Sequence, residues 1–585
     1  MATSSATIHP PRDPNTLSNY NHWLTTHTTV DFSIDFDQKL LTGDVLLRLK
    51  SITNAETKEI LLDSSYLDVF KVEVDGQKPQ GFHILDRVEP YGSAVKIQLQ
   101  EGVEMGREVD VNDTPDVKST FKFRIRSPLP VIASGLPTGT HEFKKGEHGK
   151  PGTLLYTFKQ EIPIPSYLFA IASGDIATAS IGPRSVVATG PEELLESKWE
   201  LERDMETFME AAEKIVTPYA WTTYNALILP PSFPYGGMEN PNFTFATPTI
   251  ISGDRENVDV IAHELSHSWS GNLVSNASWE HFWLNEGWTT YLERRIQASV
   301  HGSDSYRDFS AIIGWKALED SINLFGPTHE FTKLVINLKG KDPDDAFSSI
   351  PYEKGFIFLY HLETLLTQPK FDKFIPYYFT KFACRSLDSY DFKSTLLKFF
   401  ANDQDATKKL TSLNWDSWFY NPGLPPKPTF DTSLVDVCYA LADKWHSLSI
   451  DSSGSNQFTP SPSDISSLRA NQLVVFLEKI QSWSSPLRTD LVALMGNVYG
   501  FPKSKNVELS SRYYVVALRA GYRGVEAGVV DLLSWVGRMK FVRPLYRALN
   551  DLNRDLAIKT FEKYKDYYHP ICKAAVEKDL FGRKD

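Results

Sequence analysis

The chain has 585 residues, too many for a single core of ordinary size, so its length predicts three or four domains. Hydrophobic residues make up 41% and charged residues 23%, which is the balance of a folded globular protein and excludes a disordered or fibrous one. The net charge is -12, with acidic and basic residues interspersed, which argues against nucleic acid and anionic membranes as partners because both require a clustered basic face.

The pattern of residues 1–188 predicts an N-terminal all-β domain. From about residue 22 to residue 185 the apolar positions recur with a period of two, as in strands that bury one face. In VDFSIDF, for example, Phe32, Ile34 and Phe36 alternate with polar residues. In FKQEIPIPSYLF, we expect Pro163 and Pro165 to divide the chain into short strands, because proline cannot donate a hydrogen bond to a neighbouring strand.

The pattern changes after Gly190 and predicts a mainly helical second domain over residues 189–419. The segment PEELLESKWELERDMETFMEAAEKIV starts at Pro191, carries acidic residues in its first turn and spaces its apolar residues for one helix face. A strand-like piece, NALILP, and a Pro/Gly-rich loop, PPSFPYGGMENPNF, follow it. From residue 257 to about residue 420 the pattern is again mainly helical.

A linker is predicted at residues 420–433, YNPGLPPKPTFDTS, because four prolines so close together favour an extended spacer over a helix. Beyond it, NQLVVFLEKIQSW places Leu473, Phe476, Leu477 and Ile480 on one helical face. Residues 434–585 therefore predict a C-terminal all-α domain.

The segment VIAHELSHSW, residues 260–269, places His263 and His267 four residues apart, on one face of the predicted helix. This H-E-x-x-H arrangement is typical of sites where two histidines bind zinc and the glutamate, here Glu264, acts as general base. A catalytic zinc needs a third protein ligand, and Glu286 offers one at the start of the next periodic helix, HFWLNEGWTTYLERRI. The alternative to a metal site is that His263 and His267 are ordinary histidines whose hydrogen bonds are satisfied within the protein, and that Glu286 caps a helix. We predict one Zn²⁺ per chain.

Such a site predicts hydrolysis of a carbonyl compound. Zinc lowers the pKa of a bound water to about 7, and Glu264 can accept the proton of that water. The oxyanion that forms needs a further hydrogen-bond donor.

Three further segments accompany this motif: PYGGMEN at 234–240, DPDDAFSSIPYEKG at 342–355 and GRMKFVRPL at 537–545. Together with HELSHSW and LNEGW they resemble the gluzincin aminopeptidases, and among these the leukotriene A-4 hydrolase/aminopeptidase group, close to its fungal-type bifunctional members. The resemblance runs from the β-domain to the C-terminal helices. It implies a multidomain α+β fold with an all-β saddle-like N-terminal domain, a thermolysin-like mainly helical catalytic domain and an all-α C-terminal domain of helical-repeat type.

The resemblance also implies roles for individual residues. Glu239 would bind the free α-amino group of a peptide, and Tyr352 would donate a hydrogen bond to the oxyanion. Arg538 and Lys540 would hold the carboxylate of a short peptide. Without the resemblance, GGMEN is a glycine turn, Tyr352 an ordinary half-buried tyrosine, and Arg538 and Lys540 a solvated surface. The remaining residues that would line the substrate site are Pro234, Tyr235, Gly236, Gly237, Met238 and Met539.

Asp344 matches the acid that, in the animal enzymes of this group, directs water to a distant carbon of a lipid epoxide. Phe347 stands where animal members carry a tyrosine, which argues against efficient leukotriene conversion. We therefore expect peptide hydrolysis, with weak epoxide hydrolysis as a secondary activity.

The relatives carry some dozens of additional residues, with a Gln-x-Gln-Ala-type segment that lines the amine pocket, where this chain runs directly into NDTPDVKSTF at Asn112. Gln98 and Gln100, which alternate in a predicted strand, are poor substitutes for it. Either the chain is a variant or gene-model product with impaired activity, or it is a true shortened paralogue. The zinc ligands, Glu264 and Tyr352 lie outside this gap.

Three hypotheses about the function follow from these observations. The leading one is a zinc aminopeptidase that cleaves N-terminal residues from di- and tripeptides with a free N-terminus. The alternatives are an epoxide hydrolase as the main activity and a catalytically impaired zinc-binding or peptide-binding protein. We expect a monomer.

The cellular setting is predicted from the absence of targeting signals. The N-terminal segment has no basic region followed by an apolar one, and no apolar run is long enough to cross a bilayer. Three cysteines, odd in number and far apart, suit a reducing compartment. We expect a cytoplasmic protein that also enters the nucleus by diffusion. The cysteines are Cys384, Cys438 and Cys572.

Overall fold

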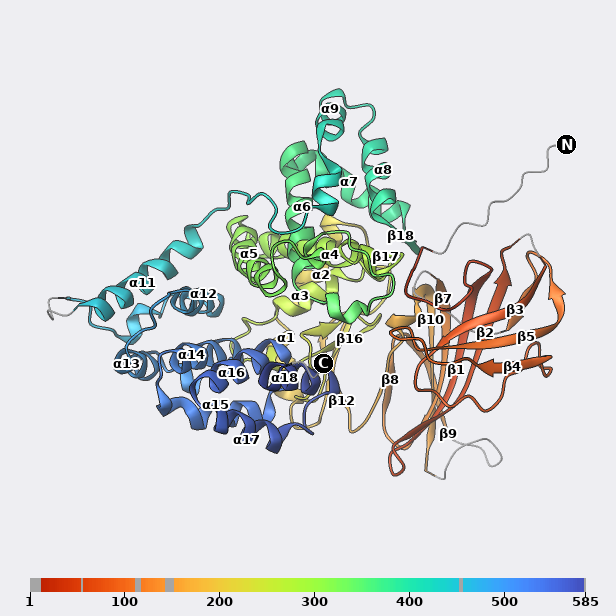
Figure 1. The fold of residues 1–585 in the computed structure, drawn as a ribbon, viewed down its shortest axis with the longest axis horizontal. Helices are drawn as coiled ribbons and strands as arrows, with labels where there is room; N and C mark the ends of the chain where they lie inside the picture. Colours follow the sequence, from red (N-terminus) through yellow and green to blue (C-terminus); the bar gives the residue numbers. More distant parts are fainter. Residues whose placement is uncertain (1–11, 54–55, 111–116, 143–151, 452–455, 583–585) are drawn as a thin grey trace.

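The computed structural model describes residues 12–53, 56–110, 117–142, 152–451 and 456–582. It has a sheet-rich N-terminal part, a helical centre and a helical C-terminal part (Figure 1). The predicted fold class, a multidomain α+β protein, is confirmed.

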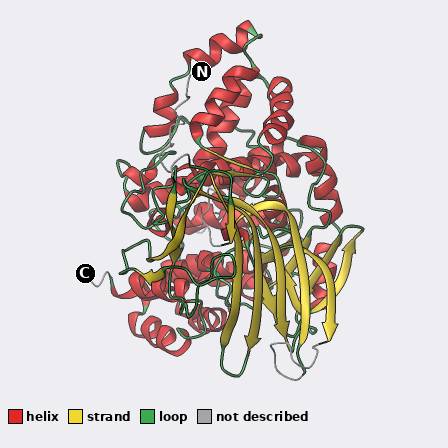
Figure 2. Cartoon of the chain, turned by 90° about the vertical axis from the view of Figure 1, so that its right-hand side faces the viewer, coloured by secondary structure: helices red, strands yellow, loops and turns green. Residues whose placement is uncertain are grey.

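The N-terminal part consists of antiparallel strand pairs with one parallel pair. Its largest sheet has the order β6-β2-β1-β7-β10-β9, in which β1 and β7 run parallel. A three-stranded sheet, β3-β5-β4, and the pair β11-β8 complete it, and the long strands lie side by side in Figure 2. The strands are β1 (Trp23–Asp35), β2 (Leu40–Ser51), β3 (Thr57–Ser64), β4 (Gly81–Ile84), β5 (Ser93–Val103), β6 (Glu108–Asp110), β7 (Lys118–Ser127), β8 (Val131–Ala133), β9 (Leu136–Glu142), β10 (Leu154–Pro165) and β11 (Ile171–Ser173).

The expectation that Pro163 and Pro165 divide this region into short strands was wrong. β10 is continuous over its 12 residues and ends at Pro165. Its pairing with β7 shifts register between Gln160 and Ile164. Pro163 falls in this irregularity, where no ladder hydrogen bond from its nitrogen is needed, so the strand tolerates it.

A five-stranded sheet of order β12-β13-β14-β16-β15 opens the catalytic part. Its strand β12 lies before the domain boundary that sequence analysis places between residues 188 and 189, and β13 ends at Thr189, so the hydrogen bonding of this sheet crosses the boundary. The domain limits derived from the sequence stay predictions. The strands are β12 (Ala177–Gly182), β13 (Ser185–Thr189), β14 (Asn225–Ile228), β15 (Gly237–Met238) and β16 (Phe243–Ala246).

The segment after Pro191 forms two helices, α1 (Leu194–Leu201) and α2 (Met205–Ile215), and not one. The buried carboxylate of Glu200 accepts hydrogen bonds from the backbone N–H groups of Gly253, at 2.9 Å, and Arg255, at 2.8 Å. These bonds orient α1 separately from α2, which buries Met205, Phe208 and Met209 in the core.

Of the remaining elements of the catalytic part, α3, α4, α5 and α6 supply residues to the cavity described below. The remaining elements are α3 (Asp259–Ser266), β17 (Val274–Asn276), α4 (Trp283–His301), α5 (Ser305–Phe325), α6 (Ile350–Leu366), α7 (Gln368–Lys381), β18 (Arg385–Leu387), α8 (Ser389–Phe399), α9 (Gln404–Ser412) and α10 (Trp415–Tyr420).

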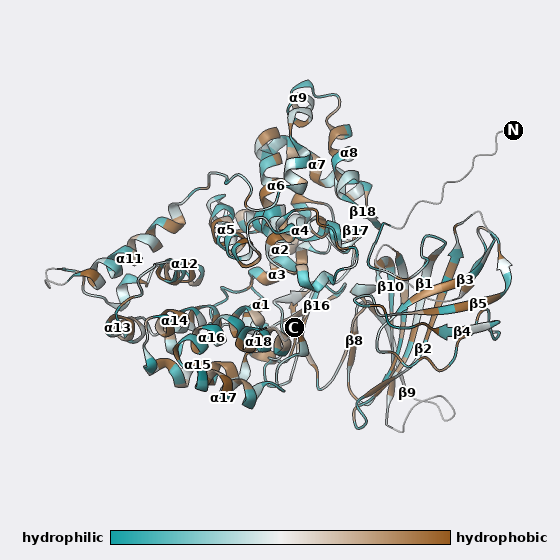
Figure 3. Cartoon of the chain, in the orientation of Figure 1, coloured by the Kyte–Doolittle hydropathy of each residue, from teal (hydrophilic) through white to brown (hydrophobic). Residues whose placement is uncertain are grey.

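The C-terminal part is all-helical, and α12, α14, α16 and α18 pack in succession, as in stacked helix pairs. Residues 421–432, within the predicted linker, contain no helix or strand. Helices carry polar as well as apolar residues along their length (Figure 3), and no described helix is long and apolar enough to span a membrane. The helices are α11 (Ser433–Ile450), α12 (Ala470–Gln481), α13 (Thr489–Tyr499), α14 (Val507–Arg519), α15 (Glu526–Trp535), α16 (Met539–Leu552), α17 (Arg554–Tyr564) and α18 (Pro570–Phe581).

Candidate metal centre and substrate cavity

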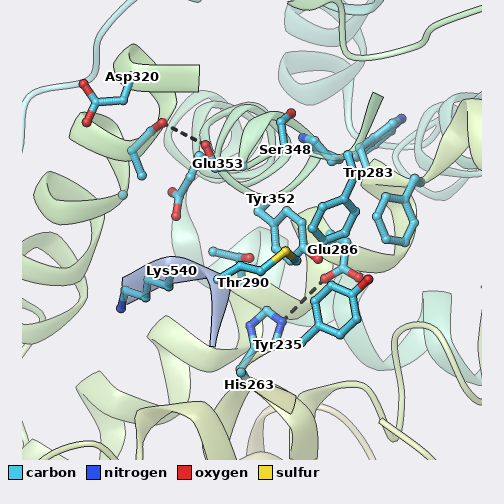
Figure 4. Close-up of a pocket in the computed structure, with 18 of the residues that line it drawn as sticks. Tyr235, His263, Trp283, Glu286, Thr290, Asp320, Ser348, Tyr352, Glu353 and Lys540 are labelled. Carbon is cyan, nitrogen blue, oxygen red and sulfur yellow. Dashed lines mark hydrogen bonds and ion pairs between the residues drawn. The ribbon is translucent and has the colours of Figure 1, made fainter. Parts of the chain in front are cut away.

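A cavity of about 1210 Å³ lies where α3, α4, α5 and α6 meet α14 and the start of α16 (Figure 4). Every residue singled out from the sequence for the metal, the chemistry or the substrate lines this cavity. The tertiary structure thus collects segments that lie between residues 234 and 540 of the chain.

The three predicted metal ligands converge from two helices. His263 lies on α3 and His267 directly follows it, while Glu286 lies in the first turn of α4. Glu286 Oε2 is 3.5 Å from His263 Nε2 and 3.4 Å from His267 Nε2. One ligand atom from each residue lies within 4.8 Å of the other two. Two nitrogens and one carboxylate oxygen are one of the donor sets found in catalytic zinc sites.

The outer nitrogens of both imidazoles are already engaged. His263 Nδ1 lies 2.9 Å from Glu293 Oε2, and His267 Nδ1 lies 2.8 Å from the carbonyl oxygen of Ser270. Such partners fix the tautomer and the ring orientation, so that both Nε2 atoms present their lone pairs to the same point. Glu293 was missed by the sequence analysis. It lies seven residues after Glu286 on α4, so helical periodicity could have identified it.

The residues fit a divalent metal. Glu286 Oε2 is buried and has no hydrogen-bond partner among the described residues, although it points at two imidazoles. Burial opposes charge on all three groups, yet Glu286 and Glu293 raise the pKa of His263 well above its usual value, and the histidines hold the pKa of Glu286 at about 2. The carboxylates that favour positive charge on the imidazoles would equally stabilise a dication held between them.

Glu264 lies beside the ligand cluster without belonging to it. It is 6% exposed, and no described group donates a hydrogen bond to its carboxylate. Burial raises the pKa of Glu264 to about 7, against the opposing effect of the two histidines. Gly237 makes this position sterically feasible, because a Cβ there would overlap the carboxylate of Glu264. A carboxylate with a pKa near neutrality is suited to accept and return a proton.

Tyr352 lies in the first turn of α6, and its ring stacks on that of His263, with centroids 5.9 Å apart and an interplanar angle of 22°. Burial and the nearby carboxylates of Glu286, Glu239 and Glu264 raise the pKa of Tyr352 well above its usual value. The hydroxyl therefore stays protonated at neutral pH. No described group accepts its hydrogen bond, so it can donate to a bound ligand.

Glu239 follows β15 and lies on the His267 side of the cluster. Its Oε1 is 3.9 Å from His267 Nδ1, and its carboxylate lies within 4.8 Å of ligand atoms of Glu264 and His267. The side-chain amide of Asn272 donates a 2.7 Å hydrogen bond to the backbone oxygen of Glu239. The carboxylate is thus held beside the metal centre by a fixed backbone, where it can meet a cation.

Arg538 and Lys540 reach the cavity through backbone contacts between α16 and the loop before β15. The Met539 N–H donates to the oxygen of Pro234 at 2.9 Å, and the Gly537 N–H to that of Pro231 at 2.8 Å. A Cβ at Gly236 would lie only 2.7 Å from Arg538 Nη2. The glycine pair therefore permits close approach of the loop to Glu264 on one side and to Arg538 on the other.

Glu508 of α14, which the sequence analysis missed, joins these cations. Its Oε1 lies 2.6 Å from Lys540 Nζ and 3.8 Å from Arg538 Nη1, and its other oxygen pairs with Arg512. Burial opposes its ionisation, but the three cations hold the pKa of Glu508 well below its usual value. Arg512 also pairs with Glu478, whose Oε1 lies 2.8 Å from Arg512 Nε, so among the described residues Arg538 and Lys540 are the two cations that pair with Glu508 alone. These two cations supply the positive groups that an anion-binding site requires.

Asp344 and Phe347 lie on the rim of the cavity before α6. Asp344 is exposed, and burial of part of its side chain, with the neighbouring Asp342 and Asp345, raises its pKa. The ring of Phe347 makes edge contacts with Tyr235, at 6.0 Å, and with Tyr352, at 6.3 Å. Phe347 thus adds an apolar ring beside Tyr235 and Tyr352 at this rim.

The junction at Asn112 lies outside the described residues. Gln98 and Gln100 lie on β5 and donate to the backbone oxygens of Lys58 and Lys78, at 3.1 and 2.8 Å, so they do not replace an amine-pocket segment. Just after the junction, Nζ of the half-buried Lys118 donates to the backbone oxygens of Asn272 and Leu273, both at 2.9 Å. The β-domain therefore still supports the loop that holds Glu239.

Comparisons with known proteins agree with this site. The peptidase family M1 domain matches residues 199–418, and the leukotriene A4 hydrolase C-terminal domain matches residues 468–580. The leukotriene A-4 hydrolase homolog of Botryotinia fuckeliana is 60% identical, over 99% of this chain and 95% of that protein. Leucine aminopeptidase 2 of Sclerotinia sclerotiorum is 60% identical, over 97% and 100%. The solved structure of yeast LTA4 hydrolase in complex with Bestatin has a TM-score of 0.89 and 41% identity, over 99% of this chain and 98% of that one.

Fold and site together define a zinc-dependent hydrolase. The chain belongs to the M1 peptidase family, in its leukotriene A4 hydrolase group. The predicted family, enzyme class and cofactor, one zinc ion per chain, are confirmed. The roles assigned to single residues stay predictions. The alignment with the Botryotinia protein runs over 624 positions, whereas this chain has 585 residues. The relative therefore has residues with no counterpart in this chain, as expected if a segment is missing before Asn112.

Proposed function

We propose that the chain is an aminopeptidase that removes the N-terminal residue from di- and tripeptides. The position of Glu239 carries this proposal, because its carboxylate lies within 4.8 Å of ligand atoms of Glu264 and His267 and leaves room for only one residue before the cleaved bond. A relative 60% identical to this chain is named leucine aminopeptidase 2, which supports the same activity.

The residues divide the work of the reaction. Zinc, when bound, polarises the scissile carbonyl and acidifies a water molecule. Glu239 binds the substrate ammonium group and sets the register of the peptide. Glu264 accepts the proton of the attacking water and returns it to the leaving amine. Tyr352 donates a hydrogen bond to the oxyanion.

Arg538 and Lys540 restrict the length of the substrate. Arg538 is fixed, with its side chain 12% exposed, and a carboxylate has to reach it while the ammonium group stays on Glu239. Only short peptides satisfy both ends at once, which favours di- and tripeptides.

The substitution Glu239→Gln tests whether Glu239 binds the α-ammonium group of the substrate. We expect it to lower kcat/KM for Ala-Ala-Ala by about 30-fold, or ~2 kcal/mol, because an amide keeps the shape but loses the charge that pairs with the ammonium group. N-acetyl-Ala-Ala-Ala, which has no ammonium group, should be cut far more slowly than Ala-Ala-Ala by the unmodified chain. The measurement is initial rates by chromatography, with the exposed Glu210→Gln as the matched control. Equal cleavage of free and acetylated peptide would contradict the proposal.

Epoxide hydrolysis is proposed as a weak second activity of the same cavity. Asp344 supports it, because it lines the cavity and is open to solvent, so it can direct a water molecule towards a ligand there. We expect Asp344→Asn to lower opening of leukotriene A4 at least about tenfold, while cleavage of an alanyl amide changes less than about twofold. Equal losses in both assays would rule out a separate role for Asp344.

We further propose that the enzyme acts as a monomer in the cytoplasm, with access to the nucleus, and binds neither nucleic acid nor membranes. All three cysteines are free in the structure, which agrees with a reducing compartment. Light scattering of the purified chain and microscopy of a fluorescent fusion test these points.

A further inference from the structure

Asp259 opens α3 and lines the same cavity, one helical turn before His263. Residues 259, 263 and 267 are spaced by four, so their side chains follow one face of the helix, about 6 Å apart along its axis. Glu239 lies beside His267 at one end of this row. At the other end, burial raises the pKa of Asp259 and the positive charge of Lys540, which lines the same cavity, opposes that rise. Figure 4 shows Lys540 and Glu286 on opposite sides of His263.

The other carboxylates near Asp259 are already engaged. Glu293 holds His263 Nδ1, and Glu508 pairs with Arg512, Arg538 and Lys540. The carboxylate of Asp259 accepts a 3.0 Å hydrogen bond from the backbone N–H of Val260, and among the described residues no side chain donates to it. Of these three carboxylates, Asp259 is therefore the one that remains available to a ligand, and it lies between the metal centre and the cationic end of the cavity.

We infer that Asp259 determines specificity for the second residue of the substrate and favours a basic side chain there. The inference rests on the proposed aminopeptidase function. An extended peptide advances about 3.5 Å per residue, so its second residue lies about 3.5 to 7 Å from the ammonium group on Glu239. A lysine or arginine side chain at this position is long enough to reach Asp259. A glutamate there would face like charge.

A structural role for Asp259 is the competing explanation. An acidic residue in the first turn of a helix stabilises the helix dipole, and Asp259 also bonds to the backbone of Val260. Loss of such a role would slow the cleavage of all peptides by the same factor. A specificity role changes the ratio between peptides, so the ratio separates the two explanations.

The test compares kcat/KM for Ala-Lys-Ala, Ala-Gln-Ala and Ala-Glu-Ala on the zinc-loaded full chain. We expect the unmodified chain to prefer them in that order, and Asp259→Asn to reduce the ratio of the Lys to the Glu peptide about tenfold, with the Gln peptide little changed. Asp320→Asn is the matched control, because Asp320 lines the same cavity but is already paired with Lys316. Asp259→Glu should retain the preference.

The outcomes are distinguishable. If the unmodified chain cleaves none of the three peptides above the background of Glu264→Gln, the proposed function fails and the inference fails with it. If the peptides are cleaved and Asp259→Asn leaves the ratio unchanged, or Asp320→Asn shifts it equally, the inference alone is overturned. Should Asp259→Asn lose zinc or stability, Asp259→Ser, which retains a hydroxyl in the first turn, provides the second neutral variant.

Discussion

Replacing Glu264 with glutamine should lower kcat for an alanyl peptide about 10³-fold while the chain keeps its zinc. Glutamine has nearly the same shape but cannot accept the proton of the attacking water, and general base catalysis contributes about 10² to 10⁴ in rate. Glu264 is 6% exposed, and its carboxylate packs directly against Gly237. The ligands His263, His267 and Glu286 are untouched, so the metal should remain.

The measurement pairs elemental analysis for zinc with initial rates for Glu264→Gln, the unmodified chain and Glu210→Gln. A loss of less than about tenfold would show that another group serves as the base. Stoichiometric zinc in the unmodified chain, with no turnover above Glu264→Gln, would instead support the alternative of a catalytically impaired zinc-binding protein, as the gap before Asn112 allows.

Tyr352→Phe should lower kcat by about 10² to 10³ with little change in KM. The hydroxyl stays protonated because burial and three carboxylates raise its pKa, and it has no acceptor among the described residues. Its hydrogen bond is therefore available to the oxyanion, and removal of one such donor costs about 10² to 10³ in kcat. Phenylalanine keeps the stacking on His263 and the edge contact with Phe282, so the structure should not change.

Steady-state kinetics on Ala-Ala-Ala check this prediction, with Tyr377→Phe, a substitution at an exposed tyrosine, as control. A rise in KM at constant kcat would show that Tyr352 stabilises the bound substrate and the transition state equally, and so does not act as an oxyanion donor. Unchanged kinetics would assign the donor role to another group.

Sequence alone determined the parts of the site that depend on a single helix. Four-residue spacing places His263 and His267 on one face wherever the helix lies, and the same spacing leaves Glu264 beside the metal. Alternating apolar positions likewise predicted the N-terminal strands. The prediction failed at Pro163, because a local shift in strand pairing absorbs the proline, and at the break between α1 and α2, because the distant contacts of Glu200 orient α1.

Only the tertiary structure decided how distant charges meet. Glu293 supports His263, Glu508 pairs with Arg538 and Lys540, and Asp259 receives a hydrogen bond from the backbone of Val260 but from no side chain of the described residues. In the sequence, each of these three residues is an acidic residue in a predicted helix and has no recognisable role in a motif. His263 lies 30 positions from Glu293, and Lys540 lies 32 positions from Glu508, so no local period encodes these two contacts. Because α3 packs on α4 and α14 packs on α16, and all four helices line the same cavity, their arrangement determines which acid neutralises a cation and which one faces the substrate.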